Sequence, residues 1–134
     1  MSLGPVHHMG HVVADLDEAI ASWQDRFGLR VTIREELPEQ LVEAAMLETE
    51  GARVELIAPT SAESGVARFL DKRGPGMHHI AFEVPDVAAA LRAYEEGGAE
   101  LIDDAPRVGL GGHMVAFLHP SSAHGVLVEL VEAG

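Results

Sequence analysis

The sequence predicts an α+β fold built from two tandem βαβββ modules around a metal site. Two observations predict it. The stretch VHHMGHVVADL, residues 6–16, returns in pattern 71 residues later as MHHIAFEVPDV, residues 77–87, and such self-similarity indicates an internal duplication. In addition, a histidine and a glutamate recur at equivalent positions of both halves, and these side chains are typical metal ligands.

The repeat sets the domain organisation. His7 and His8 correspond to His78 and His79, and residues 45–47 correspond to 116–118 at the same offset. Beyond them the offset grows by three, since residues 54–56 correspond to 128–130, which predicts three extra residues in the second hairpin. We therefore expect one domain over residues 1–134, with module 1 at about 5–59, a linking helix at about 60–75 and module 2 at about 76–132.

The elements of module 1 follow from its capping residues and its periodicity. After an alternating first strand, Asp15 is a typical helix N-cap. Apolar residues then recur at helical spacing from Leu16 to Phe27, and Gly28 suits the left-handed residue that commonly ends a helix. Three strands are expected at residues 29–35, 42–48 and 52–58.

Module 2 repeats this order. Asp86 is the expected N-cap, a helix follows from Val87 through Tyr94, and Gly97 and Gly98 end it. Strands are expected at residues 100–103, 114–118 and 125–131. Between the modules, apolar residues at 66–70 indicate a short linking helix that stops at the Gly-Pro-Gly of residues 74–76.

Composition excludes several classes of function. The formal net charge of −13 argues against nucleic acid, because its phosphates would be repelled. The chain has no cysteine, so a metal must be held by nitrogen and oxygen. No apolar run approaches the roughly 20 residues that span a bilayer, and the start MSLGP does not resemble a signal peptide. We therefore expect a cytoplasmic protein without membrane or nucleic-acid partners.

Strand alternation separates the four histidines of the repeat into two pairs. In module 2, His78 shares a face with apolar residues, whereas His79 shares the other, thinner face with Ala81 and Glu83. Module 1 divides in the same way, with His8 and Gly10 on the thinner face. We expect His8 and His79 to point into the cleft that the sheet encloses, and the other two histidines to be packed or partly exposed.

Two glutamates complete the predicted site. Glu55 and Glu129 each lie inside an apolar run, and burial of a lone carboxylate costs several kcal/mol unless something pairs with it. A metal is the simplest partner, which gives the predicted ligand set His8, Glu55, His79 and Glu129. This set suits Co²⁺, Ni²⁺, Mn²⁺ or Zn²⁺ with positions left open. Two carboxylates that approach from opposite sides, Glu129 and Glu55, would serve as the catalytic acid and base for proton transfer on a carbon acid, with the metal stabilising the enolate.

The duplicated pattern H…E…H…E resembles the vicinal oxygen chelate superfamily. Within it the chain is most similar to the methylmalonyl-CoA epimerases, in GVARFLDKRGPGMHHIAFEVPDV, DDAPRVGLGGHMVAFLHP, GVLVELVE and, more loosely, LPEQLVEAAML. The resemblance covers nearly the whole chain. It implies a single domain with a cupped, eight-stranded mixed sheet, and a homodimer with a divalent metal, often cobalt. The implied reaction interconverts the 2R and 2S forms of methylmalonyl-CoA through a metal-stabilised enolate. His8, His79 and Glu129 match the family's ligands, and Glu55 matches a position that is Gln or Glu.

The chain departs from that family at two positions. Some epimerases carry a Glu proposed as acid or base in the strand after PEQ, where this chain has Ala44, with Glu43 one residue away and on the other face. A Lys that often follows HP is Ser121 here, which removes one positive contact to an acyl-CoA substrate. We expect Glu55 to take the place of the missing acid or base.

Three alternatives share this fold. A glyoxalase I-type lactoylglutathione lyase commonly uses the same four ligands on a glutathione hemithioacetal. A ring-cleaving dioxygenase usually keeps two histidines and one carboxylate around iron, which fits less well. A non-catalytic, small-molecule-binding member such as a drug-resistance protein often lacks the metal ligands, so four intact ligands speak against it. The fold alone does not imply a function.

Overall fold

The computed structural model describes residues 2–133 and contains the predicted βαβββ order twice. The first set comprises β1 (Val6–Val12), α1 (Leu16–Phe27), β2 (Arg30–Leu37), β3 (Val42–Thr49) and β4 (Ala52–Pro59). The linking helix α2 (Gly65–Arg73) follows. The second set comprises β5 (Gly76–Glu83), α3 (Val87–Glu96), β6 (Arg107–Val108), β7 (Met114–Leu118) and β8 (Val128–Glu132). Short 3₁₀ turns lie at Pro38–Gln40, Leu110–Gly112 and Pro120–Ala123.

Hydrogen bonds join the eight strands in the order β2-β3-β4-β1-β5-β8-β7-β6, which confirms the predicted α+β class and the mixed sheet. The pairs β1/β4 and β5/β8 are parallel, whereas β2/β3, β3/β4, β6/β7 and β7/β8 are antiparallel. The chain divides into two compact units, one formed by Met9–His78 and the other by the start of the chain through His8 together with the segment from His79 onward.

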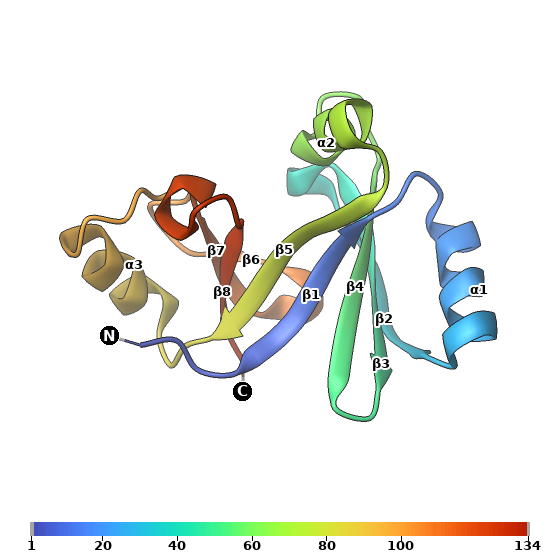
Figure 1. The fold of residues 1–134 in the computed structure, drawn as a ribbon, viewed down its shortest axis with the longest axis horizontal. Helices are drawn as coiled ribbons and strands as arrows, with labels where there is room; N and C mark the ends of the chain where they lie inside the picture. Colours follow the sequence, from blue (N-terminus) through green and yellow to red (C-terminus); the bar gives the residue numbers. More distant parts are fainter. Residues whose placement is uncertain (1, 134) are drawn as a thin grey trace. The chain divides into compact units, whose positions relative to one another are not determined.

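In the Met9–His78 unit, α1 packs along the strands β3 and β4, on the face that Figure 1 shows it covering. Its apolar stripe joins Leu16 and Ile20 to Leu47 and Leu56 in one buried cluster. Asp15 caps the helix as predicted, since its side chain accepts the backbone N–H of Glu18 at 3.0 Å. The core of this unit therefore lies between α1 and the strands, and the opposite strand face is left for other contacts.

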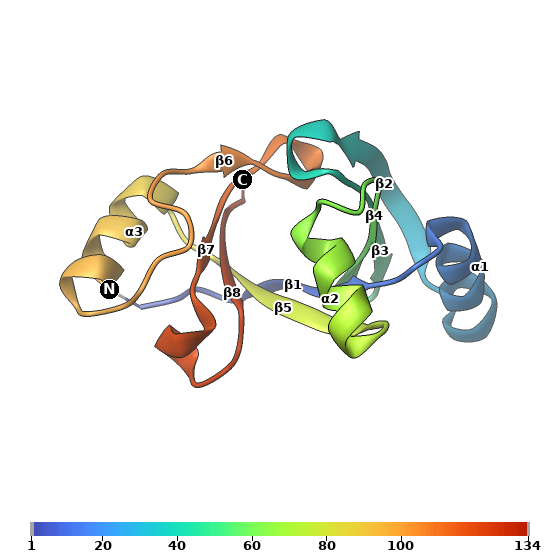
Figure 2. The same cartoon turned by 90° about the horizontal axis from the view of Figure 1, so that it is seen from above.

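The other unit has the same construction. Helix α3 packs on β7 and β8, where Val87, Leu91 and Leu130 form its buried cluster. Asp86 caps α3 by accepting the N–H of Ala89 at 3.0 Å, again as predicted. Figure 2 shows the connection from β7 to β8, which includes the turn Pro120–Ala123 and accounts for the extra residues that the sequence predicts there. The start of the chain is fixed to β5, because Gly4 N–H donates to the Glu83 carbonyl and Glu83 N–H donates to the Pro5 carbonyl, both at 2.9 Å.

Strand register reproduces the sequence repeat residue by residue. Glu55 of β4 pairs with Gly10 of β1, and Glu129 of β8 pairs with Ala81 of β5. Gly10 and Ala81 are equivalent at the first offset of the repeat, while the two glutamates are equivalent at the larger one. The duplication is thus preserved in the hydrogen bonding of the strands.

One predicted strand is wrong. Residues 100–103 do not form a strand, and Leu101 makes only an isolated bridge to Leu118. The Asp103 carboxylate accepts the N–H of Phe117 at 2.8 Å, so a side chain takes the place of a ladder carbonyl there. Pro106 has no N–H to donate, and regular pairing resumes only at Arg107, in the two-residue strand β6. No helix in the described part of the chain has the length and apolarity needed to cross a bilayer.

Candidate metal centre

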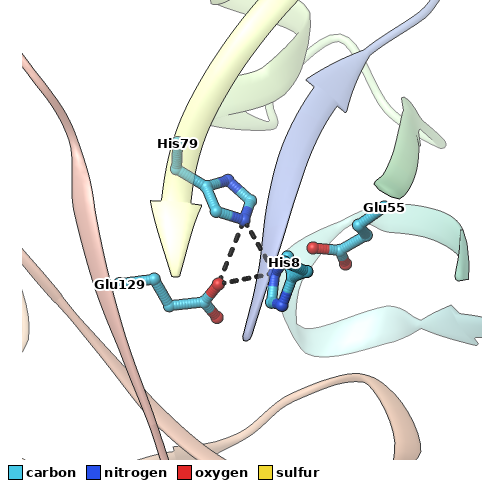
Figure 3. Close-up of side chains that lie close together, drawn as sticks. All are labelled: His8, Glu55, His79 and Glu129. Carbon is cyan, nitrogen blue, oxygen red and sulfur yellow. Dashed lines mark hydrogen bonds and ion pairs between the residues drawn. The ribbon is translucent and has the colours of Figure 1, made fainter. Parts of the chain in front are cut away.

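Three of the predicted site residues converge within one unit. His8 comes from β1, His79 from β5 and Glu129 from β8, and Figure 3 shows their side chains turned toward one another. Their exposed fractions are 5, 3 and 6 %. Strand alternation places each of them on the face away from α3. These buried polar groups therefore form a cluster that needs compensation.

The ligand atoms of this cluster form a nearly equilateral triangle. His8 Nε2 lies 3.1 Å from His79 Nε2, and each of these nitrogens lies 3.0 Å from Glu129 Oε1. That oxygen is buried, and within the described residues its contacts to the two imidazoles are ion pairs without regular hydrogen-bond geometry. Ligands about 2.1 Å from a six-coordinate ion stand about 3.0 Å apart when they are neighbours. The triangle therefore has the dimensions of one face of an octahedral site, and the donor set fits a divalent metal.

Electrostatics keep Glu129 ionised. Burial of the carboxyl group opposes its charge, but His79 and His8 stabilise the charge more strongly and lower the pKa of Glu129 to about 2. The carboxylate is therefore available as a negatively charged ligand throughout the neutral pH range. Its partners are imidazoles, which bind a metal in their neutral form.

His7 contacts the far side of His8. The Nδ1 atoms of these two buried rings are 2.8 Å apart, so they share one proton. If His8 Nε2 binds a metal, His8 carries its proton on Nδ1 and donates it to Nδ1 of His7. His7 also meets His113 edge-on, with ring centroids 5.7 Å apart. Sequence analysis expected His7 to be packed or partly exposed, and the structure shows it buried beside a predicted ligand.

Phe117 closes the second side of the cluster. It pairs with Glu129 across β7 and β8, so both side chains lie on one face. Its ring meets the His79 ring edge-on at 5.4 Å between centroids. The apolar ring limits the access of water to the imidazole, which strengthens electrostatic interactions at the centre.

Glu55 belongs to the Met9–His78 unit and is 7 % exposed. It is the fourth residue drawn in Figure 3. It pairs with Gly10 on one side and with Met46 on the other, which makes it the register equivalent of Glu129. Because His8 and Gly10 are two residues apart on β1, their side-chain directions are the same. The role of Glu55 as a ligand stays a prediction that this register supports.

Glu43 does not supply the acid or base that some epimerases carry at the position of Ala44. Ala44 is fully buried on the same strand face as Met46 and Glu55, whereas Glu43 points to the opposite face. There its carboxylate accepts hydrogen bonds from Arg34 at 3.1 and 3.4 Å. Glu43 is therefore held away from the face that carries Glu55.

A different acid, Glu35, was not predicted from the sequence. It lies directly opposite Ala44 on β2 and is half-buried. Paired residues of antiparallel strands share a face, so Glu35 lies on the face of Glu55, one pair further along the strands. An alternating pattern in β2 was the available signal, but a register irregularity between Val31 and Ile33 obscures it.

Comparison with known proteins agrees with this architecture. Residues 7–117 match the glyoxalase/bleomycin resistance protein/dioxygenase superfamily, and the chain belongs to that superfamily. Within it, the chain is 38 % identical to the uncharacterized protein YqjC of Bacillus subtilis, over 93 % of this chain and 89 % of that protein. It is 34 % identical to the ethylmalonyl-CoA/methylmalonyl-CoA epimerase of Cereibacter sphaeroides, over 96 and 97 % of the two chains.

Solved structures give the same result. The methylmalonyl-CoA epimerase of Mycobacterium tuberculosis superimposes with a TM-score of 0.93 at 37 % identity, over 98 % of this chain and 89 % of that one. A methylmalonyl-CoA epimerase in complex with methylmalonyl-CoA and NH₄⁺ also gives a TM-score of 0.93 at 37 % identity, over 99 and 96 % of the chains. The resemblance to epimerases predicted from the sequence is confirmed.

Proposed function

We propose that this chain is a metal-dependent isomerase that interconverts the 2R and 2S forms of methylmalonyl-CoA by proton transfer at C2. The observation that carries the proposal is the triangle of His8, His79 and Glu129, with Nε2 and Oε1 atoms 3.0–3.1 Å apart. It occurs in a chain similar over almost its whole length to epimerases of malonyl-type thioesters. The buried, oxygen- and nitrogen-only donor set supports a divalent ion, for which we propose Co²⁺, with Ni²⁺, Mn²⁺ and Zn²⁺ as alternatives.

The ligand set that we propose adds Glu55 to the triangle. Its burial and its register equivalence to Glu129 support this role, since a duplicated module would contribute one histidine and one glutamate each time. When bound, a divalent ion supplies Lewis acidity toward the oxygens of a chelated thioester. His8 and His79 then serve as neutral donors, and His7 holds His8 in the required tautomer.

Proton transfer needs one acid or base on each face of C2. Oε1 of Glu129 faces the two imidazoles, which makes Oε2 the oxygen that would exchange a proton with the substrate. Glu55 is the group that we propose for the opposite face. Glu35, half-buried on the same strand face as Glu55, is the alternative for this second role.

Solvent exchange at C2 tests the proposal. Purified protein is loaded with Co²⁺ and incubated with (2S)-methylmalonyl-CoA in D₂O, and NMR follows both deuterium incorporation and stereochemical purity. We expect deuterium incorporation together with racemisation. Glu129→Gln should abolish both, while Glu95→Gln, the same change at an exposed position of α3, should leave both unchanged.

Two results would contradict the proposal. The first is absence of exchange when cobalt is bound, and turnover of a methylglyoxal–glutathione hemithioacetal by the same sample would then indicate the lyase reaction. The second is full exchange in Glu129→Gln, which would remove the triangle from the chemistry. Our proposal also includes a cytoplasmic homodimer, and sedimentation equilibrium of the cobalt-loaded chain tests the oligomeric state.

A further inference from the structure

Arg107 is the single Lys or Arg among residues 93–134 of a chain with a formal net charge of −13. It lies in the same unit as the triangle of His8, His79 and Glu129. We infer that Arg107 binds an anionic group of the substrate, a carboxylate or a phosphate, beside the metal centre. The inference rests on the proposed function, which supplies the class of substrate. Its test measures binding and does not depend on turnover.

Strand register places Arg107 on the face of the metal centre. Arg107 pairs with Val115 across β6 and β7, and Val115 pairs with Val131 across β7 and β8. Phe117 and Glu129 form the next pair on the same face, because they are two residues away from Val115 and Val131. Arg107 therefore starts two strands across and two residues along from Glu129, at roughly 12 Å, and its long side chain can span part of that distance.

The guanidinium extends in the direction of the centre. Its Cζ lies 5.5 Å from the centroid of the Phe117 ring, within the range of a cation–π contact. The opposite neighbour of Phe117 is the His79 ring, at 5.4 Å between centroids. Guanidinium, phenyl ring and metal-facing imidazole thus follow one another along a single face.

One hydrogen-bond donor of Arg107 is unused within the described residues. Its Nε is buried and has no hydrogen-bond partner. The nearest carboxylate oxygen, Oδ2 of Asp103, is 3.6 Å away and already accepts the N–H of Phe117 at 2.8 Å. The side chain is 41 % exposed, so the guanidinium is accessible. Asp103 orients the arginine without accepting a hydrogen bond from its Nε. The guanidinium therefore presents planar N–H donors to an incoming oxyanion.

Charge explains why such a residue is needed. An acidic protein repels an acidic substrate at long range, so the substrate's anionic groups need a local cation. A malonyl-type thioester carries a carboxylate on its acyl part and, as a coenzyme A ester, phosphates on its carrier. Either group has the geometry that a guanidinium recognises with two parallel hydrogen bonds.

Binding calorimetry on the cobalt-loaded, full-length protein tests the inference with two probes, malonate and coenzyme A. Arg107→Met should weaken the probe that occupies the site by about 10- to 100-fold, the usual effect of losing a charged hydrogen bond. Arg107→Lys should recover part of this loss, because it keeps the charge but not the paired donors. Arg92→Met removes the same charge from an exposed position of α3 and should leave both affinities within twofold of wild type.

Each outcome has one meaning. Weaker malonate binding identifies the substrate carboxylate as the ligand, and weaker coenzyme A binding identifies a phosphate. Unchanged affinity for both probes in Arg107→Met, or in Arg107→Lys if the methionine variant does not fold, would overturn the inference. So would an equal loss in Arg92→Met. A protein that binds a probe through Arg107 but shows no exchange at C2 would overturn the proposed function and leave the anion site intact.

Discussion

Glu55 and Glu129 occupy the same position in two copies of one module, yet the residues around them differ. Glu129 pairs with Ala81 and Phe117, and Glu55 pairs with Gly10 and Met46. Both carboxylates are buried at nearly the same exposed fraction, 6 and 7 %. The duplication has therefore preserved the backbone pairing and the two buried acids, while the side chains that surround them have diverged.

The next pair along the strands shows a larger divergence. In module 2, Arg107 lies opposite Val115, and in module 1 Glu35 lies opposite Ala44, the residue equivalent to Val115. One module thus presents a cation at this place and the other an acid. At this place module 2 therefore offers a cation that suits an anion, and module 1 offers a further acid in addition to the buried glutamate that each module carries.

The largest expected effect comes from exchanging the two buried glutamates for glutamine separately. Glu129→Gln should lower the rate of exchange at C2 by about 10²–10⁴-fold, because the variant loses the charge that faces both imidazoles and the oxygen that exchanges a proton. Glu55→Gln should lose less of the exchange, because an amide oxygen can still bind a metal and Glu129 still exchanges the proton on its own face of C2. Racemisation should nevertheless stop, because the other face has lost its proton-transfer group. NMR exchange rates at saturating cobalt measure both. Equal losses would show that the modules contribute alike.

Glu35→Gln should lower kcat by about 10²-fold with little change in KM, if Glu35 rather than Glu55 is the proton-transfer group of module 1. The control is Glu36→Gln on the same strand, whose side chain points to the opposite face. Steady-state kinetics in D₂O distinguish the two variants. A wild-type kcat in Glu35→Gln would leave Glu55 as the proton-transfer group of module 1.

His7→Phe should weaken cobalt binding by about 10- to 100-fold, since His8 loses the acceptor that holds its proton on Nδ1. His7→Asn should recover affinity, because its side-chain oxygen also accepts. His113→Phe, which removes only an edge-on ring contact, serves as the control. Competition with a chromophoric chelator measures the affinity without any substrate, and an unchanged value in His7→Phe would remove His7 from the site.

The smallest effects should come from the helix caps. Asp15→Ala and Asp86→Ala each remove a 3.0 Å capping bond and should each lower the free energy of unfolding by about 1 kcal/mol. Denaturant titration of the metal-free protein measures both. A clearly larger loss in one variant would show that the two modules do not depend equally on their first helix.

Sequence reasoning worked best where the repeat supplied two copies of one signal. The prediction of each histidine and glutamate of the site was supported by the equivalent residue in the other half. The helix N-caps were predicted in the same way, one in each half. It failed at residues 100–103, where the local pattern resembled a strand but Asp103 and Pro106 interrupt backbone pairing. The sequence does not show that the Asp103 carboxylate accepts the N–H of Phe117, which a carbonyl of a neighbouring strand would otherwise accept.

Arg107 and Glu35 were missed for a related reason. The offset of the repeat aligns Arg107 with Glu36, whereas strand pairing makes it equivalent to Glu35. An error of one residue turns a side chain to the other face of a strand. The contact between His7 and His8 was also beyond reach, because neighbours on a strand are expected to point apart.

The positions of His8, His79 and Glu129 along the chain have a consequence for biosynthesis. His8 precedes the Met9–His78 unit along the chain, whereas Glu129 follows that unit and lies on β8, 50 residues after His79. Translation delivers a chain from its N-terminus onward, so the Met9–His78 unit is complete long before Glu129 exists. A nascent chain can therefore complete the Met9–His78 unit before the triangle of His8, His79 and Glu129 exists, and these three ligand atoms come together only after β8 has been made.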